Sequence, residues 1–323
     1  MINIPEIPQD LFPIACGCMK LGGKWTADPL EVNAQRAARA AVEAALEAGI
    51  NVFDHADIYA RGKSEETFKT IFNEQPSLRE KVVIQTKCGI RFPGEPRQES
   101  PGRYDFSFGH IMRSVEGSLD RLGTSYVDVL FLHRPDPLVE PQEVARAFEE
   151  LHTSGKVRAF GVSNHTPAQM ELLALSLNPP IRVSQVQFSL LHTDLIDGGL
   201  TGRSPRPVSA AGTIEYCRRH GILLQAWGPL AGGMLGGSKS SKKDDPDCVK
   251  AVRAQLADIA AEKGSLPEII ALAWILRHPA KIQPVIGSRR PRRIQALCRA
   301  TEIDLTREEW YRLFIAGRGE HVP

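Results

Sequence analysis

Four ionisable side chains stand at, or shortly after, the ends of short apolar runs in the sequence. They are Asp54, Tyr59, Lys87 and His133. A short, almost wholly apolar run is typical of a strand that is buried on both faces of a parallel sheet. Ionisable groups that follow such strands are candidates for a functional site if the fold brings the strand ends together.

This set of side chains has the chemistry to protonate a carbonyl oxygen as that oxygen gains negative charge. A tyrosine has an ordinary pKa of about 10, so it is protonated at neutral pH but is a reluctant acid. A neighbouring lysine cation stabilises the phenolate and lowers that pKa, and a carboxylate beside the lysine keeps the ammonium charged. An imidazole can hydrogen-bond the same substrate oxygen and orient it. None of these groups supplies a hydride, so a reduction would need a cofactor.

Polar and aromatic residues also follow the other apolar runs of the chain. They are Ser163, Asn164, Gln187, Trp227 and Ser288. Taken singly, each residue has an ordinary structural explanation, such as capping a turn, packing or facing solvent. Their significance therefore depends on the elements that position them.

The apolar runs alternate with segments that have helical periodicity and clear start or stop signals. The runs predict eight strands, over residues 11–18, 51–54, 81–87, 127–132, 157–162, 183–188, 222–227 and 282–286. One helix start is marked by Thr166 as N-cap and Pro167 in the first turn, and Thr306 with Glu309 forms a capping box for a final helix. Strands that alternate with helices predict a parallel sheet.

Eight such units in 323 residues predict an α/β fold, the closed (β/α)8 TIM barrel, as a single domain over residues 1–323. The alternative, an open doubly wound sheet, would carry a G-x-G-x-x-G turn after its first strand. Gly17, Gly22 and Gly23 do not have this spacing. In a barrel all strand ends meet at one face, so the ionisable residues would share one pocket.

Two long stretches rich in Gly, Pro and charge, 91–108 and 190–211, predict loops at the face that carries the pocket. These loops and the C-terminal tail would wall the pocket. Candidate apolar walls are Trp25, Phe92, Tyr104 and Phe106.

Four arginines surround Pro291 in the segment 289–293, directly after the last predicted strand. A cluster of this kind is often a solvated positive patch. At the start of a helix that follows a barrel strand, however, it favours a phosphate-binding site.

The composition is that of an ordinary globular protein. Lys and Arg number 40 and Asp and Glu number 38, so the net charge is only +2. This balance argues against nucleic acid or an anionic membrane as the main partner. The six cysteines are scattered without C-x-x-C spacing, which favours reduced thiols in a cytoplasmic protein.

The first residues lack the basic and apolar regions of a signal peptide, and no apolar run approaches the ~20 residues that cross a bilayer. We therefore expect a cytoplasmic protein with no membrane partner. Because the sequence shows no obvious exposed apolar stripe, we also expect a monomer.

Six motifs, in their order and spacing, resemble the aldo-keto reductases. They are the segments 51–59, 86–87, 128–136, 155–164, 227–233 and 285–288. The resemblance covers nearly the whole chain, and the turn His133-Arg134-Pro135-Asp136 is most similar to a bacterial subgroup of oxidoreductases.

The resemblance implies NADPH-dependent reduction of an aldehyde or ketone, with no metal ion. Tyr59 would be the general acid, supported by Lys87 and Asp54, and His133 would orient the carbonyl group. Ser163, Asn164 and Gln187 would hold the nicotinamide carboxamide, on whose ring Trp227 would stack.

The resemblance also implies where the rest of NADP would lie. Gly228, Leu230 and Gly232 would lie along the diphosphate, and Ser288, Arg293 and Arg290 would meet the 2′-phosphate. Met19 completes the expected cofactor-binding set. Trp227 replaces the tyrosine or phenylalanine that is common in this class, and Gly287 replaces a lysine.

Two other functions stay open at this point. A metal-dependent barrel hydrolase would use Asp54, His55, Asp57 and His133 as ligands, but neighbouring strand residues face opposite sides and no H-E-x-x-H motif occurs. A cofactor-sensing regulatory barrel, similar to potassium-channel β-subunits, could keep the same site residues with only vestigial reductase activity.

Overall fold

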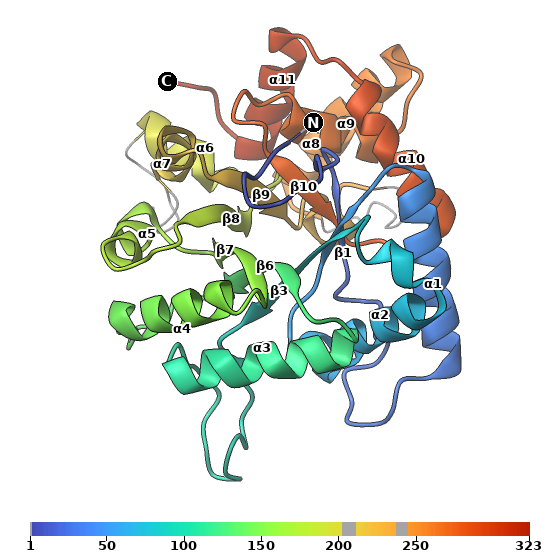
Figure 1. The fold of residues 1–323 in the computed structure, drawn as a ribbon. Coiled ribbons are helices and arrows are strands. Elements are labelled where there is room, and N and C mark those ends of the chain that lie inside the picture. The colour runs from blue at the N-terminus through green and yellow to red at the C-terminus, as the bar shows by residue number, and fades with distance from the viewer. Residues whose placement is uncertain (1, 202–210, 237–244) are drawn as a thin grey trace.

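A closed barrel of eight parallel strands forms the centre of the molecule (Figure 1). The computed structural model describes residues 2–201, 211–236 and 245–323. Within these residues the barrel strands, in spatial order, are β1 (Ala15–Gly17), β10 (Gln283–Ile286), β9 (Leu223–Trp227), β8 (Ile181–Gln187), β7 (Val157–Ser163), β6 (Val127–Leu132), β3 (Val83–Cys88) and β2 (Val52–Asp54). The predicted TIM barrel is confirmed.

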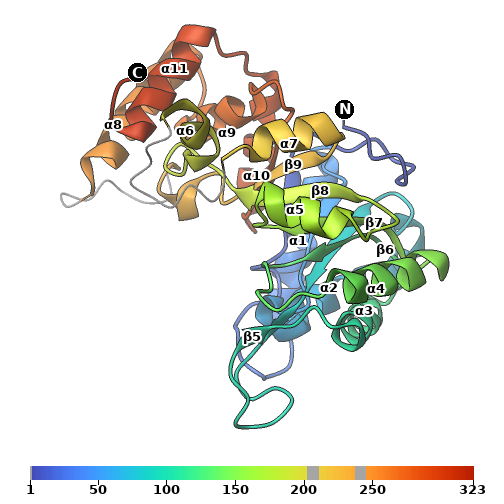
Figure 2. The ribbon, with the colours of Figure 1, turned by 90° about the vertical axis from the view of Figure 1, so that its left-hand side faces the viewer.

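Helices cover the outside of the barrel, as Figures 1 and 2 show. They are α1 (Val32–Glu47), α2 (Lys63–Glu74), α3 (Phe108–Leu122), α4 (Pro141–Thr153), α5 (Pro167–Ala174), α6 (Asp194–Thr201), α7 (Thr213–His220), α8 (Asp247–Glu262), α9 (Pro267–Leu276), α10 (Pro291–Cys298) and α11 (Arg307–Arg318). The expected N-cap at Thr166 and the expected capping box at Thr306 are both present, with Thr166 accepting from the Gln169 backbone N–H and Thr306 from that of Glu309. No helix in these described stretches is long and apolar enough to span a bilayer.

Each central strand is buried on both of its faces, which explains the continuous apolar runs. In β6, Leu130 and Leu132 pack outward in the layer between strands and helices, whereas Val129 and Phe131 pack inside the barrel. The segment before β1 contributes Ile4, Ile7 and Leu11 to the same interior cluster, together with side chains of the barrel strands. The N-terminal segment therefore closes the end of the barrel at which the strands begin.

The prediction that 91–108 and 190–211 are loops is wrong in part. The first stretch contains an antiparallel hairpin of β4 (Ile90–Arg91) and β5 (Arg103–Tyr104), and the second contains α6. Strands of two residues are too short to show a period, and α6 carries a Gly-Gly pair that disfavours a helix. Residues 202–210 lie outside the described residues.

Asp128 is a buried carboxylate that ties three strands together near their starts. It accepts hydrogen bonds from Arg79 Nη2 at 2.9 Å, Arg158 Nη1 at 2.9 Å and the Ile84 backbone N–H at 2.8 Å. The ring of Tyr126 lies against both guanidinium groups, whose central carbons are 3.8 and 4.1 Å from the ring centre. Asp128 therefore bridges two arginine guanidinium groups while it supplies an acceptor to β3.

We expect Asp128→Ala to lower the free energy of unfolding by about 3–5 kcal/mol, because the buried Arg79 would lose its counter-ion. Urea unfolding followed by circular dichroism measures this change. The control is Asp120→Ala, which breaks an exposed ion pair with Lys69 and should cost under about 1 kcal/mol. Equal losses in the two variants would contradict this account of the core.

Candidate active site

Three of the four predicted catalytic residues are joined by hydrogen bonds at the ends of the strands. Lys87 Nζ lies 2.6 Å from Asp54 Oδ1, 2.8 Å from the carbonyl oxygen of His55 and 3.4 Å from the Tyr59 hydroxyl. The fourth, His133, faces Tyr59 edge to face, with ring centres 5.8 Å apart. The structure therefore brings the phenol, the ammonium, the carboxylate and the imidazole into one cluster.

The register of the parallel strands explains this convergence. Asp54 pairs with Gln85 across β2 and β3, and Lys87 pairs with Phe131 across β3 and β6. The last residues of β2, β3 and β6 therefore stand at nearly the same height. His133 directly follows β6, and its backbone N–H donates to the Cys88 carbonyl.

Tyr59 lies on a strained turn between β2 and α2. The turn Tyr59–Gly62 contains Ala60 with a φ of 50° and Arg61 with a φ of 58°, both in the left-handed region that non-glycine residues rarely adopt. Gly22 packs so closely against this region that a Cβ atom there would overlap the backbone of Ser64. Close packing therefore holds the strained turn, which fixes the place of the phenol.

Burial and the buried cation set the charge states of the cluster. Burial raises the pKa of Tyr59 above its ordinary 10, and the charge on Lys87 opposes that rise. Burial by itself lowers the pKa of Lys87, but the Asp54 carboxylate and the Tyr59 hydroxyl together outweigh this effect, so the net pKa is raised. Burial, with Lys87 and Arg134 nearby, holds the pKa of His133 well below its ordinary value. At neutral pH the phenol is therefore protonated, the lysine charged and the imidazole neutral.

The residues expected around the nicotinamide gather at the ends of β7, β8 and β9. Asn164, with a φ of 62°, donates from Nδ2 to Ser163 Oγ at 2.8 Å and accepts from Trp227 Nε1 at 2.9 Å. Gln187 is the register partner of Trp227 at the end of β8. The guanidinium of Arg134 lies 5.6 Å from the Trp227 ring centre, which the sequence analysis did not anticipate.

The segment after β9 offers an open backbone surface. Gly228 and Gly232 have φ values of 66° and 65°, and no atom lies within 4 Å of the place where a Cβ would stand. Leu230 lies between them, just before the 3-10 turn Ala231–Gly233. An extended ligand can approach such a backbone closely. Met19 lies in the turn after β1 and is 44% exposed.

The basic cluster stands beside this segment, at the start of α10. Ser288 Oγ accepts from the backbone N–H of Arg290, which is the N-cap residue of the helix. Arg293 lies 3.7 Å from Glu268, and a Cβ at Gly236 would overlap its guanidinium. The segment after β9 therefore lies directly against Arg293 at Gly236. The exposed glycine backbone and the basic helix start are suited to the phosphates of a dinucleotide. The indole of Trp227 and the side-chain amides beside it are suited to a planar ring that carries a carboxamide.

Sequence reasoning missed two glutamines that also reach the cluster. Gln85 Nε2 donates to Asp54 Oδ1 at 2.6 Å, and Gln185 Nε2 donates to the same oxygen at 3.1 Å. Gln85 stands two residues before Lys87, and Gln185 stands two residues before Gln187. Each glutamine therefore lies on the same side of its strand as a predicted site residue. This spacing was the available signal.

The four aromatic residues expected to wall the pocket differ in their position and exposure. The ring of Trp25 is 45% exposed and its centre lies 6.3 Å from that of Tyr59, so this indole borders the cluster. Phe106 is buried, stacks on His165 and leaves no room for a Cβ at Gly89. Phe92 lies under the Arg61 guanidinium, and Tyr104 is on the hairpin strand β5.

The geometry gives no support to the metal-dependent alternative. Across residues 2–201, 211–236 and 245–323, no group of three or more His, Cys, Asp or Glu side chains is placed to hold a metal ion. The ring of His55 packs edge to face on Phe68, and burial lowers its pKa to about 3. Burial raises the pKa of Asp57 to about 8, so this carboxyl is protonated at neutral pH.

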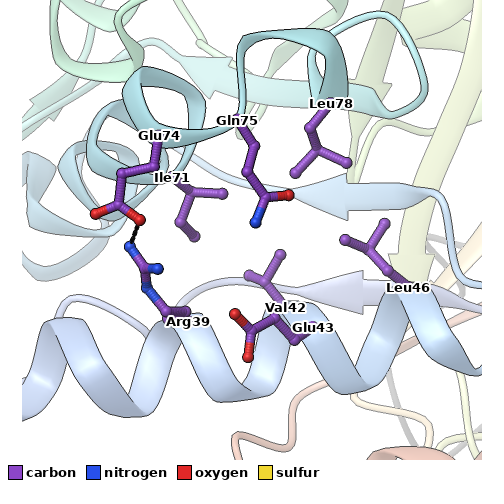
Figure 3. Close-up of a pocket in the computed structure, with 8 residues that line it drawn as sticks. All are labelled: Arg39, Val42, Glu43, Leu46, Ile71, Glu74, Gln75 and Leu78. Atoms are coloured by element: carbon purple, nitrogen blue, oxygen red, sulfur yellow. Dashed lines mark hydrogen bonds and ion pairs between the residues drawn. The ribbon is translucent and has the colours of Figure 1, made fainter.

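A small groove between α1 and α2 lies away from the strand ends (Figure 3). Apolar side chains such as Val42 and Ile71 line it, and an ion pair between Arg39 and Glu74 crosses one end. None of the residues discussed above lines this groove. The groove is therefore separate from the candidate site at the barrel mouth.

Comparison with known proteins identifies the family. The sequence profile of the aldo/keto reductase family matches residues 13–316. The uncharacterized oxidoreductase YcsN of Bacillus subtilis is 37% identical over 87% of this chain and 88% of its own length. The 6-dehydroglucose reductase of Agrobacterium fabrum is 34% identical over 97% of this chain and 96% of its own length.

Solved structures agree with this result. The glycerol dehydrogenase of Gluconobacter oxydans superimposes with a TM-score of 0.80 at 26% identity, covering 98% of this chain and 94% of that one. Aldo-keto reductases use NADP(H) and reduce carbonyl groups. By its profile, its relatives and its barrel, this chain belongs to the aldo-keto reductase family and is an oxidoreductase.

Proposed function

We propose that this protein reduces an aldehyde or a ketone to an alcohol with NADPH, and that Tyr59 donates the proton. The observation that carries the proposal is the position of Lys87 Nζ, which lies between Asp54 Oδ1 at 2.6 Å and the Tyr59 hydroxyl at 3.4 Å. A phenol beside a buried cation is suited to giving up its proton only when an acceptor becomes strongly basic.

In this mechanism the hydride that the carbonyl carbon receives would come from bound NADPH. As negative charge develops on the carbonyl oxygen, Tyr59 transfers its hydroxyl proton to that oxygen. Lys87 stabilises the resulting phenolate, and Asp54 holds Lys87 in place and charged. The neutral imidazole of His133, which faces the phenol, would orient the carbonyl oxygen by a hydrogen bond.

The remaining residues of the surface would hold the cofactor. Ser163, Asn164 and Gln187 would bind the carboxamide, and the ring of Trp227 would support the nicotinamide. Backbone groups of Gly228, Leu230 and Gly232, with Met19 nearby, would follow the diphosphate. Ser288, Arg290 and Arg293 would bind the 2′-phosphate, which favours NADPH over NADH.

The names of two similar proteins, a 6-dehydroglucose reductase and a glycerol dehydrogenase, suggest that carbonyl compounds with several hydroxyl groups should be tried first. A screen of NADPH oxidation over sugar, short-chain, steroid and quinone carbonyls tests the activity. Multiple turnovers with any of them exclude the cofactor-sensing alternative, whereas a single slow oxidation of bound NADPH would favour it.

We expect Tyr59→Phe to lower kcat by about 10²- to 10⁴-fold, because the proton donor is lost while the ring and its packing remain. Binding of NADPH, followed by its fluorescence, should stay within about twofold of the unmodified protein. Tyr311→Phe, which removes a half-exposed hydroxyl on α11, is the matched control and should leave both quantities unchanged. Full turnover by the Tyr59 variant would reject this tyrosine as the acid.

The pH profile of reduction should be flat from about pH 6 to 9 and should fall only above about pH 10. Reduction needs a protonated Tyr59, and burial raises the pKa of this phenol, so the rate is lost as pH rises through that value. His133 stays neutral over the flat range because burial holds its pKa well below the ordinary value. A midpoint near 6.5 in kcat, abolished by His133→Asn, would contradict this assignment.

We expect Arg290→Ala and Arg293→Ala each to raise the KM for NADPH by about tenfold, since each removes a charged hydrogen bond to the 2′-phosphate. The KM for NADH should change little, because NADH lacks that phosphate. Arg299→Ala, at the other end of α10, removes the same charge and serves as the control. An equal effect on both cofactors would place these arginines elsewhere on the dinucleotide or outside its site.

A further inference from the structure

Four glutamines lie inside the barrel, where the neighbouring side chains are mainly apolar. They are Gln85 on β3, Gln185 on β8, Gln225 on β9 and Gln283 on β10, and each is at most 2% exposed. Gln185 and Gln225 are register partners, as are Gln225 and Gln283, so three of them are direct neighbours across adjacent strands. A buried amide is costly unless all of its hydrogen bonds are made.

These amides are joined into one chain of hydrogen bonds. Gln283 Nε2 donates to the backbone carbonyl of Phe12 at 2.6 Å, and its Oε1 accepts from Gln225 Nε2 at 2.7 Å. Gln225 Oε1 then accepts from Gln85 Nε2 and from Gln185 Nε2, each at 3.0 Å. Gln225 Nε2 also donates to Gln85 Oε1 at 3.1 Å, so the side chain of Gln225 is held on both of its ends.

The chain has a direction, and it ends at Asp54. A backbone carbonyl can only accept, so Gln283 must turn its NH2 group to Phe12 and its oxygen to Gln225. Gln225 in turn presents its oxygen to Gln85 and Gln185, whose NH2 groups reach Asp54 Oδ1 at 2.6 and 3.1 Å. The network thus delivers two N–H donors to the oxygen that also accepts from Lys87.

We propose that Gln85, oriented by Gln225, is a positioning residue that shares the Asp54 carboxylate with Lys87 and thereby keeps the lysine charge available to Tyr59. This inference rests on the proposed reductase function. Its basis is the geometry: Asp54 Oδ1 receives Gln85 Nε2 and Lys87 Nζ at the same distance of 2.6 Å, whereas the Tyr59 hydroxyl is 3.4 Å from Nζ.

The physical reason is competition for one negative charge. Tyr59 is faced by Lys87 from β3, Asp54 from β2, Cys18 after β1 and His133 after β6. Without the Gln85 donor, the carboxylate binds the ammonium more strongly and draws its charge away from the phenol. The phenolate then loses stabilisation, so Tyr59 becomes a weaker acid and the proton transfer slows.

The test compares Gln85→Leu with Gln283→Leu. Both changes remove one buried amide of the same network, but of these two residues Gln85 contacts Asp54 and Gln283 does not. We expect Gln85→Leu to lower kcat by about tenfold and to move the high-pH midpoint of the profile up by about one unit, with the KM for NADPH unchanged. Gln283→Leu should keep kcat within about twofold and leave the midpoint in place. Equal effects in the two variants would reduce the network to a structural role and overturn the proposal.

A second measurement needs no activity. Each leucine variant is combined with Asp54→Ala, and the unfolding equilibrium constants are compared in a double-mutant cycle. We expect Gln85 and Asp54 to be non-additive by about fivefold or more, and Gln283, which reaches Asp54 only through other amides, to couple to it less strongly. Additive behaviour of Gln85 and Asp54 overturns the proposal. If no carbonyl compound supports NADPH oxidation by the unmodified protein, the proposed function fails instead. The double-mutant cycle then still decides whether Gln85 holds Asp54.

Discussion

The site depends on keeping one ammonium ion charged inside the protein. Lys87 is only 1% exposed, and an unpaired charge in such a place would lose its proton. The Asp54 carboxylate at 2.6 Å and the His55 carbonyl at 2.8 Å replace the water that the ammonium has lost. Both partners lie at the end of β2, next to the β3 strand that carries Lys87, so the pairing of these two strands is what stabilises the buried charge.

The strained turn and the buried charge are two parts of one arrangement. The phenol of Tyr59 must stay close to Lys87, although the turn that carries it contains two left-handed non-glycine residues, Ala60 and Arg61. Strain of this kind persists only where surrounding contacts over-determine the backbone. Those contacts include the close approach of Gly22 and the hydrogen bond of the Asp57 backbone N–H to the Lys87 carbonyl.

The sequence was sufficient to predict the barrel and the convergence of Asp54, Tyr59, Lys87 and His133, for a shared reason. Strands such as Val127–Leu132 are buried on both faces, so their apolar runs are unmistakable, and parallel strands carry their last residues to one face. The cytoplasmic location, the monomer and the single domain stay predictions.

Contacts inside the barrel were beyond sequence reasoning. Gln85 and Gln225 are 140 positions apart and meet only because the sheet closes with a particular stagger. The hairpin of β4 and β5 was missed because two-residue strands have no period, and α6 because of its glycines. The side chain of Arg134 lies over Trp227 for reasons that depend on the whole mouth of the barrel.

The plug formed by Ile4, Ile7 and Leu11 has a consequence for how the chain acquires its shape. These side chains pack against Val285 of the last strand, nearly the whole chain away. During synthesis they leave the ribosome long before β10, yet their packing site is complete only when β10 has closed against β1. These apolar side chains therefore stay uncovered while most of the chain is made, and contacts of such long sequence separation are slow to form.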